Sequence, residues 1–150
     1  MLKSRLRFDT FKRDVQCDEL EEKALRHPGS HSKTLKITQH QLDNHDVFPS
    51  LHGSMTDPDH PIESLQFFKV TFNDAKSNFV AKVMEDMDCQ LTELVFFKCR
   101  MRNTDMRIIQ RAIKERNKNQ EAVKLQSLIF EEIFIPENTA KVIGDLLADC

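Results

Sequence analysis

The sequence predicts an α/β fold in which a strand-and-helix unit repeats along one domain of residues 1–150. The first observation is a near-repetition: residues 62–72 read IESLQFFKVTF and residues 91–101 read LTELVFFKCRM. The second is a change of period within each copy, from the two-residue alternation of a strand to the spacing of a helix face. The third is the regular interval between copies, which favours true repetition over a coincidence of composition.

The strand part of each copy contains an anchor leucine, and further copies are found at both ends of the chain. The anchors are Leu6, Leu35, Leu65, Leu94 and Leu128, at intervals of 29, 30, 29 and 34 residues. The copies therefore start near residues 3, 32, 62, 91 and 125. One such unit cannot bury its own apolar face, whereas stacked copies share a continuous core.

The helix part of each copy shows apolar residues at i, i+1, i+4 and i+5, which lie on one face of a helix. This pattern occurs at Phe79, Val80, Val83 and Met84, at Ile108, Ile109, Ala112 and Ile113, and at Val142, Ile143, Leu146 and Leu147. Leu20, Ala24 and Leu25 fit the same scheme in the first copy. In the second copy, Pro49 interrupts the helix expected near residues 47–51.

Two of these helices have sequence signals at their starts. Asn103, Thr104 and Asp105 precede one helix, and Asn138 with Thr139 precedes another. Their side-chain oxygens can accept hydrogen bonds from the unpaired N–H groups of a first helical turn. The last interval is the longest, so residues 114–124 are expected to form an extended helix or a loop.

The strand signature resembles that of the leucine-rich repeats, L-x-x-L-x-L-x-x-N/C-x-L. Its positions are filled in order by Leu91, Leu94, Phe96, Cys99 and Met101. The repeat length and the helical second half are similar to those of the ribonuclease-inhibitor-like subclass. The resemblance implies a solenoid of about five repeats, with parallel strands on a concave face and helices on a convex face.

The chain departs from the family at the Asn/Cys position of the signature. The residues at this position are Phe11, His40, Val70, Cys99 and Ile133. The buried asparagine ladder of the family is therefore absent. Phenylalanine also replaces leucine at several anchor positions, and this is expected to alter the packing between coils.

The resemblance implies that the residues between the anchors point away from the helices, in columns given by the register. The first column is Arg7, Lys36, Gln66, Val95 and Ile129. The second is Asp9, Thr38, Phe68, Phe97 and Glu131, and the third is Thr10, Gln39, Lys69, Lys98 and Glu132. Phe68 and Phe97 are thus expected to be neighbours on adjacent strands.

An exposed aromatic patch with a charged rim is typical of protein-binding surfaces. The sequence therefore predicts a protein-interaction module that binds another protein through Phe68, Phe97, Val95, Ile129, Lys69, Lys98, Glu131 and Glu132. The alternatives are that other segments of the chain cover this patch, or that the phenylalanine pairs only strengthen cross-strand packing.

Motifs for catalysis or cofactor binding are not found, so neither an enzyme nor a cofactor is expected. The chain has no Gly-rich phosphate loop, GxSxG elbow or HExxH motif. Six histidines lie close together in the sequence: His27, His31, His40, His45, His52 and His60. Their spacing has no zinc-site form, and the neighbouring Asp, Asn, Gly and Pro residues favour a solvated loop over a metal site.

The four cysteines and the charges define the expected surroundings of the chain. Cys17, Cys89, Cys99 and Cys150 form no CxxC pair, so reduced and mostly buried thiols are expected. With 22 basic and 24 acidic residues, the chain has no general attraction for nucleic acid or anionic membranes. A polar start and the lack of a long apolar run predict a cytoplasmic protein without a membrane span.

A local basic run is interpreted as a solvated helix face, with a phosphate or acidic-protein contact as the alternative. Its members are Lys98, Arg100, Arg102, Arg107, Arg111, Lys114, Arg116 and Lys118. The last helix ends without an evident polar cap, which leaves open a contact with another chain. The oligomeric state is not defined by the sequence.

A second fold class also fits part of the chain. Residues 67–102 can be divided into one strand and two helices, which resembles a ribbon-helix-helix DNA-binding dimer. That interpretation requires a helix over residues 91–102. The β-branched and aromatic residues there, and the match to the other copies, favour a strand.

Overall fold

The structure is a computed structural model, and it describes residues 3–7, 33–119, 121–134, 136 and 139–148. The strands are β1 (Lys3–Arg7), β2 (Thr34–Thr38), β3 (Ser64–Phe68), β4 (Glu93–Phe97) and β5 (Ser127–Glu131). The helices are α2 (Gln39–Asp43), the 3-10 helix η1 (His45–Val47), α3 (Phe48–Met55), α4 (Asp74–Glu85), α5 (Asn103–Lys118) and α6 (Thr139–Ala148).

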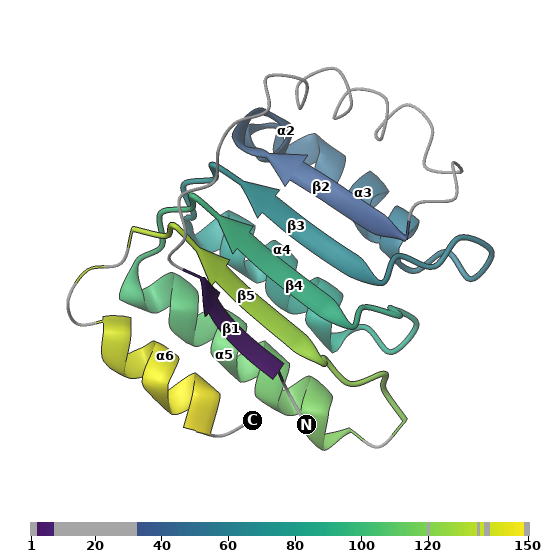
Figure 1. The fold of residues 1–150 in the computed structure, drawn as a ribbon. Coiled ribbons are helices and arrows are strands. Elements are labelled where there is room, and N and C mark those ends of the chain that lie inside the picture. The colour runs from purple at the N-terminus through teal and green to yellow at the C-terminus, as the bar shows by residue number, and fades with distance from the viewer. Residues whose placement is uncertain (1–2, 8–32, 120, 135, 137–138, 149–150) are drawn as a thin grey trace.

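The strands form a parallel sheet in the order β1-β5-β4-β3-β2, and β2 to β5 alternate with helices along the chain. The predicted α/β class is therefore confirmed. Helices α4 and α5 lie behind the sheet, α6 lies alongside α5, and α2 and α3 lie near β2 (Figure 1). The described helices thus share one side of the sheet. The opposite side, which carries no helix among the described residues, is called the helix-free face below.

The predicted register of β2 to β5 is confirmed. Leu35 pairs with Leu65, Leu65 with Leu94, and Leu94 with Leu128. Backbone bonds just before the strands repeat from coil to coil. The carbonyl of Lys33 accepts hydrogen bonds from both Glu63 N and Ser64 N, at 2.8 and 3.0 Å, and the carbonyls of Glu63 and Thr92 do the same toward their next coils. The arrangement is therefore repeat-like over these four strands.

The position of β1 differs from the prediction. In an array of five successive copies β1 would lie beside β2, but in the structure it pairs with β5. The register also differs, because Ser4 is paired with Leu128 and Leu6 with Phe130. The pairing is thus shifted by two residues from the predicted register. The shift moves Arg7 from the first predicted column to the level of Glu131, and β1 lies at the edge of β5, where the five predicted copies placed no further strand.

A row of phenylalanine rings forms the centre of the core. Phe67, Phe96 and Phe130 are paired in the strand register, and their rings stack at centroid distances of 5.4 and 5.3 Å with interplanar angles of 13° and 11°. Phe72 packs edge-on against Phe67 and Phe96, at 5.3 and 5.5 Å. Such aromatic contacts add to the free energy gained by burying the rings. The phenylalanines in anchor positions thus link neighbouring coils through their rings.

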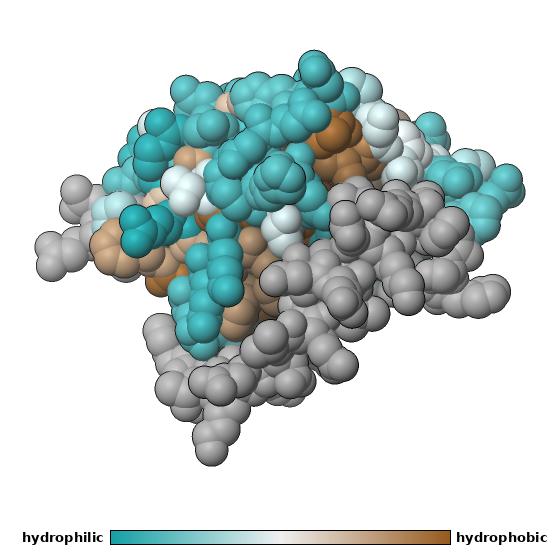
Figure 2. All heavy atoms as spheres, turned by 90° about the horizontal axis from the view of Figure 1, so that it is seen from above, coloured by the Kyte–Doolittle hydropathy of each residue, from teal (hydrophilic) through white to brown (hydrophobic). Residues whose placement is uncertain are grey.

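The five signature residues of the fourth copy are all buried: Leu91, Leu94, Phe96, Cys99 and Met101. Seen from above, hydrophilic residues cover most of the described surface, and hydrophobic residues show only in smaller areas between them (Figure 2). The apolar residues of the signature therefore serve the interior, as the spacing predicts.

The predicted helix faces are confirmed in α4 and α5, and in the described part of α6. Their buried residues include Phe79, Val80, Val83 and Met84 in α4, Ile109, Ala112 and Ile113 in α5, and Val142 and Ile143 in α6. Ile108 packs against the core while partly exposed. The expected helix around Leu20 lies outside the described residues.

Two helix starts show how local sequence sets the boundaries. At α5, the Asp105 carboxylate accepts a hydrogen bond from Arg102 N at 2.8 Å, so Asp105 stabilises the first turn. At α3, the prediction that Pro49 interrupts the helix is wrong, because Pro49 lies in the first turn. A proline is tolerated there since the N–H it lacks would have no helical partner. The longer last interval is accommodated by the greater length of α5 and the loop that follows.

The structure excludes the helix that the ribbon-helix-helix interpretation requires. Residues 93–97 form β4, which is paired in parallel with β3 on one side and β5 on the other. The β-branched and aromatic residues of this segment fit the half-buried surface of a sheet.

Candidate functional site

The helix-free face carries the side chains that alternate with the core residues of each strand. At the strand starts these are Thr34, Ser64, Glu93 and Ser127. At the strand centres they are Lys36, Gln66, Val95 and Ile129, and at the strand ends Thr38, Phe68, Phe97 and Glu131. The first two predicted columns are therefore confirmed for β2 to β5.

The strand starts on this face are polar and linked to one another. Ser64 Oγ donates a hydrogen bond of 2.7 Å to Glu93 Oε1, and Gln66 Nε2 donates one of 3.2 Å to Ser64 Oγ. The first bond joins β3 to β4, and both bonds satisfy polar groups in a row where Ser64 is buried. This end of the face contributes to sheet cohesion.

Phe68 and Phe97 lie side by side at the strand ends, as the sequence predicts. Their ring centroids are 5.2 Å apart and the ring planes are tilted by 44°. Both side chains are partly exposed, whereas Phe67 and Phe96, one residue earlier in each strand, are fully buried. Because side chains alternate along a strand, Phe68 and Phe97 lie on the helix-free face and not in the core.

Val95 and Ile129 extend this aromatic pair into an apolar patch. Val95 is paired with Ile129 on the next strand and lies two residues before Phe97 on the same face of its own strand. Val95 is only 9% exposed, because it lies in the middle of the sheet, while Ile129 is half-buried. The four residues Phe68, Val95, Phe97 and Ile129 are called the apolar patch below.

Lysine side chains lie over both rings of the patch. Lys36 Nζ is 5.5 Å from the centroid of Phe68, and Lys98 Nζ is 5.2 Å from the centroid of Phe97. At such distances an ammonium group is attracted by the electron-rich face of the ring. Lys98 Nζ also lies 3.1 Å from Glu132 Oε2. Charged groups therefore border the apolar patch directly.

The third predicted column does not continue the strands. Lys69, Lys98 and Glu132 have φ values of 52°, 51° and 49°, in the left-handed region that non-glycine residues rarely adopt. Each follows the last residue of its strand, where the chain turns from the sheet toward the next helix. Lys69 N still donates to Phe97 O, and Lys98 N to Glu131 O, both at 2.9 Å. All three residues are exposed at the ends of the strands, so they form a rim and not a sheet column.

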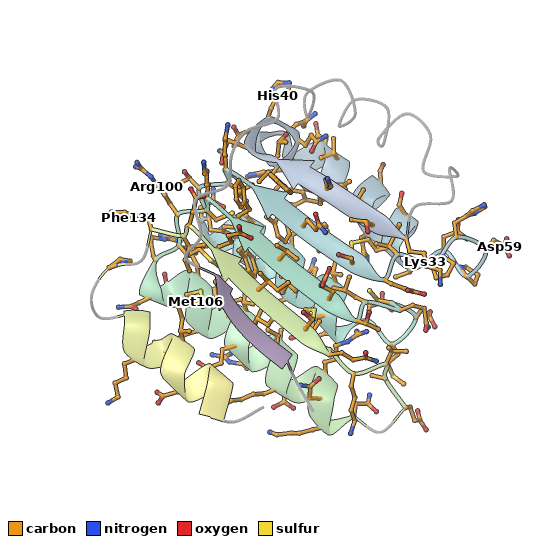
Figure 3. The ribbon with its side chains drawn as sticks, in the orientation of Figure 1. Lys33, His40, Asp59, Arg100, Met106 and Phe134 are labelled. Atoms are coloured by element: carbon orange, nitrogen blue, oxygen red, sulfur yellow. The ribbon has the colours of Figure 1, made fainter. Side chains whose placement is uncertain are left out.

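An exposed aromatic residue in this region was missed by the sequence interpretation. Phe134 is 67% exposed, and the Arg100 guanidinium lies 5.6 Å from its ring centroid. Figure 3 shows the two side chains together at the edge where the strands end, far from Lys33 at the strand starts. The signal was present in the alternation, because Phe134 lies between Ile133 and Ile135 of the signature.

The basic run is not one solvated face, because Arg116 is buried. Its guanidinium donates to the carbonyls of Met84, Asp86, Cys89 and Leu91, at 3.1, 3.3, 2.6 and 3.2 Å. The Met84 carbonyl lies in the last turn of α4 and the other three follow the end of that helix, where backbone acceptors lack helical partners. Arg116 therefore has a structural role between α5 and the chain that connects α4 to β4.

Arg102 also has a structural role. It donates to both Asp105 oxygens, from Nε at 2.9 Å and from Nη2 at 2.8 Å, and Nη2 lies 2.8 Å from Asp74 Oδ1. Lys118 pairs with Glu115 at 3.1 Å. Much of the basic run is thus used in contacts within the chain, which weakens its interpretation as a phosphate-binding surface.

The described histidines are dispersed. His40 lies on α2 and is distant from Asp59 (Figure 3). His52 Nε2 is 2.8 Å from Asp86 Oδ2, and His60 Nδ1 is 3.3 Å from Asp57 Oδ2. Across residues 33–119 and the other described ranges, no group of three or more His, Cys, Asp or Glu side chains is placed to hold a metal ion. His27 and His31 lie outside those ranges.

Cys89 and Cys99 are buried free thiols, as predicted, while Cys17 and Cys150 lie outside the described residues. Burial raises the pKa of Cys99 to about 11. Its Sγ lies 3.4 Å from the carbonyl oxygens of both Phe67 and Phe97. A thiol with such a raised pKa is a weak nucleophile at neutral pH, so Cys99 belongs to the core.

Comparisons with protein-family models, with curated proteins and with solved structures gave no match to this chain. Among the described helices, none has the length and apolar character needed to cross a membrane. The candidate site therefore rests on the geometry of the helix-free face.

Proposed function

We propose that the chain is a short solenoid of the leucine-rich-repeat type and that its helix-free face binds another protein. The repeat-like register of β2 to β5 supports the solenoid, with β1 added at the β5 edge. The proposed contact residues are Phe68, Phe97, Val95, Ile129, Lys69, Lys98, Glu131 and Glu132.

The Phe68–Phe97 pair is the observation on which the proposal depends. The core already contains Phe67 and Phe96, so the second ring of each strand is not needed to fill it. A pair of partly exposed rings next to an aliphatic side chain provides the apolar centre of a contact, and the surrounding charges provide a polar rim. Exposed aromatic residues in such a setting are frequent energetic centres of protein interfaces.

Selection from a displayed library of random 12-residue peptides tests the proposal. The purified chain should enrich a defined set of peptides, and the double substitution Phe68→Ala with Phe97→Ala should reduce their capture about tenfold or more. Met87→Ala is the matched control, because Met87 is an exposed apolar residue in the loop after α4. Circular dichroism should show the same helicity for all three proteins.

Two results would overturn this function. One is that the wild-type chain enriches no peptides. The other is that the folded double variant captures the same peptides as the wild type.

A further inference from the structure

We propose that the partner segment is acidic as well as apolar: a peptide stretch that carries Asp or Glu side chains beside aromatic or aliphatic ones. This inference rests on the proposed function and specifies the chemistry of the partner. It follows from the charges around the apolar patch, which differ in sign from the net charge of −2 of the whole chain.

The basic border of the patch consists of Lys36, Lys69, Lys98 and Arg100. All four residues are exposed, and they adjoin the Phe68 side of the patch and the rim at the strand ends. Within the described part of the chain, Lys36, Lys69 and Arg100 form no ion pair with a carboxylate. No carboxylate of the described residues therefore neutralises these three charges, and Lys36 and Arg100 keep their charge while they lie over rings.

The acidic residues beside the patch are outnumbered by basic ones. Glu132 pairs with Lys98 at 3.1 Å. Glu131 lies at the end of β5, so the described side chains beside the patch comprise two carboxylates and the four basic groups of the border. The field over the patch is consequently dominated by the basic border, which attracts anionic groups and disfavours cationic ones.

A peptide fits this border better than a single-stranded nucleic acid does. Bases bind by stacking on accessible ring faces, but ammonium groups lie over Phe68 and Phe97. The rest of the patch is aliphatic, through Val95 and Ile129, and offers no further ring on which a base could stack. Peptide carboxylates can pair with Lys36 and Lys69 while an apolar side chain contacts the ring edges and Ile129.

Two pools of fluorescent 12-residue peptides test the inference. Both pools share the same Phe and Leu positions, and they differ only in carrying Asp and Glu or Lys and Arg at the others. We expect the acidic pool to bind the wild-type chain about tenfold more tightly than the basic pool. This preference should shrink as the salt concentration rises from about 0.05 M to about 0.5 M.

Charge reversal identifies the residues responsible. Lys36→Glu together with Lys69→Glu should abolish or invert the preference for the acidic pool. Lys82→Glu on the exposed surface of α4 is the matched control and should preserve it. These lysines are exposed, so circular dichroism should report folded proteins in each case.

The outcomes separate this inference from the proposed function. Equal binding of the two pools, lost in the Phe68→Ala and Phe97→Ala double variant, would overturn the acidic partner and keep the binding face. Binding of neither pool would overturn both. Tighter binding of a 12-nucleotide single-stranded DNA than of the acidic pool would replace the peptide with a nucleic acid.

Discussion

The hydroxyl of Ser77 donates a hydrogen bond of 2.9 Å to the carboxylate of Asp105, and both side chains are fully buried between α4 and α5. Arg102 completes the site by donating to both carboxylate oxygens. A buried carboxylate is stable only when its oxygens are paired in this way. The Ser77–Asp105 bond therefore links α4 to α5, which belong to successive coils. It does so through a carboxylate that would destabilise the core if its oxygens were unpaired.

The Asp105 site predicts acid-dependent stability. Burial raises the pKa of Asp105, but hydrogen bonds from Arg102 and Ser77 outweigh it, so the pKa lies below its usual value. A lowered pKa stabilises the folded state above the unfolded-state value of about 4. This contribution is lost as the pH falls through the folded-state pKa, because the unfolded chain takes up the proton first.

Urea denaturation between about pH 7 and pH 3 measures this effect. Asp105→Asn should lower the free energy of unfolding by about 2 kcal/mol at pH 7 and should flatten its decline in acid. Asp74→Asn is the control, because this exposed carboxylate also pairs with Arg102 and its loss should cost less than about 1 kcal/mol. An identical acid decline in wild type and Asp105→Asn would contradict the assignment.

Removal of Arg116 should destabilise the fold strongly. Arg116→Met keeps much of the side-chain volume but leaves carbonyls after α4 without donors, so a loss of about 3 kcal/mol is expected. Arg111→Met, at an exposed position on the same helix, should change stability by less than about 0.5 kcal/mol. Equal urea midpoints for the two variants would refute the structural role of Arg116.

Truncation of two adjacent phenylalanines should lower the free energy of unfolding by very different amounts. Phe96→Ala removes the central ring of the core row and should cost about 3 to 5 kcal/mol. Phe97→Ala removes a partly exposed ring, so its cost should be well below that of Phe96→Ala. Thermal unfolding of both variants measures the contrast. A larger loss from Phe97→Ala would mean that the helix-free face is covered in the native protein.

The left-handed residue after β3 predicts a stabilising glycine. Lys69→Gly should raise the free energy of unfolding by about 0.5 to 1 kcal/mol, because glycine adopts positive φ without steric cost. Lys82→Gly within α4 should lower it by about 1 kcal/mol. Chemical denaturation of the two variants provides the comparison, and destabilisation by Lys69→Gly would contradict the assigned turn.

Cysteine cross-linking tests the strand order directly. Arg5 is paired with Ile129, and neighbouring strands are about 4.8 Å apart, which is within the Cα spacing of disulfides. In a chain with Cys17 and Cys150 replaced by serine, Arg5→Cys with Ile129→Cys should form a cross-link on oxidation. Arg5→Cys with Thr34→Cys, the pair expected if β1 lay beside β2 in the predicted register, should form none. Mass spectrometry after proteolysis detects both, and the reverse pattern would restore the order of successive copies.

The parts of the fold predicted from sequence are those encoded within one repeat. The spacing of apolar residues defines both a strand and the helix after it, so β3, α4, β4 and α5 and their register follow from the pattern. The Phe68–Phe97 pair follows from the same register. Its geometry with lysines over the rings does not, because side-chain positions depend on neighbouring coils.

Two further features were not predicted from the sequence. The position of β1 depends on contacts between residues that are far apart in the chain, and Arg116 is a charged residue of a type that is usually exposed. Nothing in Lys3–Arg7 itself specifies whether β1 pairs with β2 or β5. Arg116 looked solvated because it is charged. Its place seven residues after Ile109 and three after Ile113 puts it on the buried face of α5, and that spacing could have identified it.

The strand order also constrains how the chain can fold while it is being made. Among the described strands, β1 is the first to emerge from the ribosome and β5 the last, yet the two are neighbours in the sheet. Strands β2 to β5 can pair in their order of synthesis, whereas β1 must wait for its neighbour. Because a pairing so distant in sequence is slow to form, we expect the pairing of β1 with β5 to be the last step in completing the described sheet.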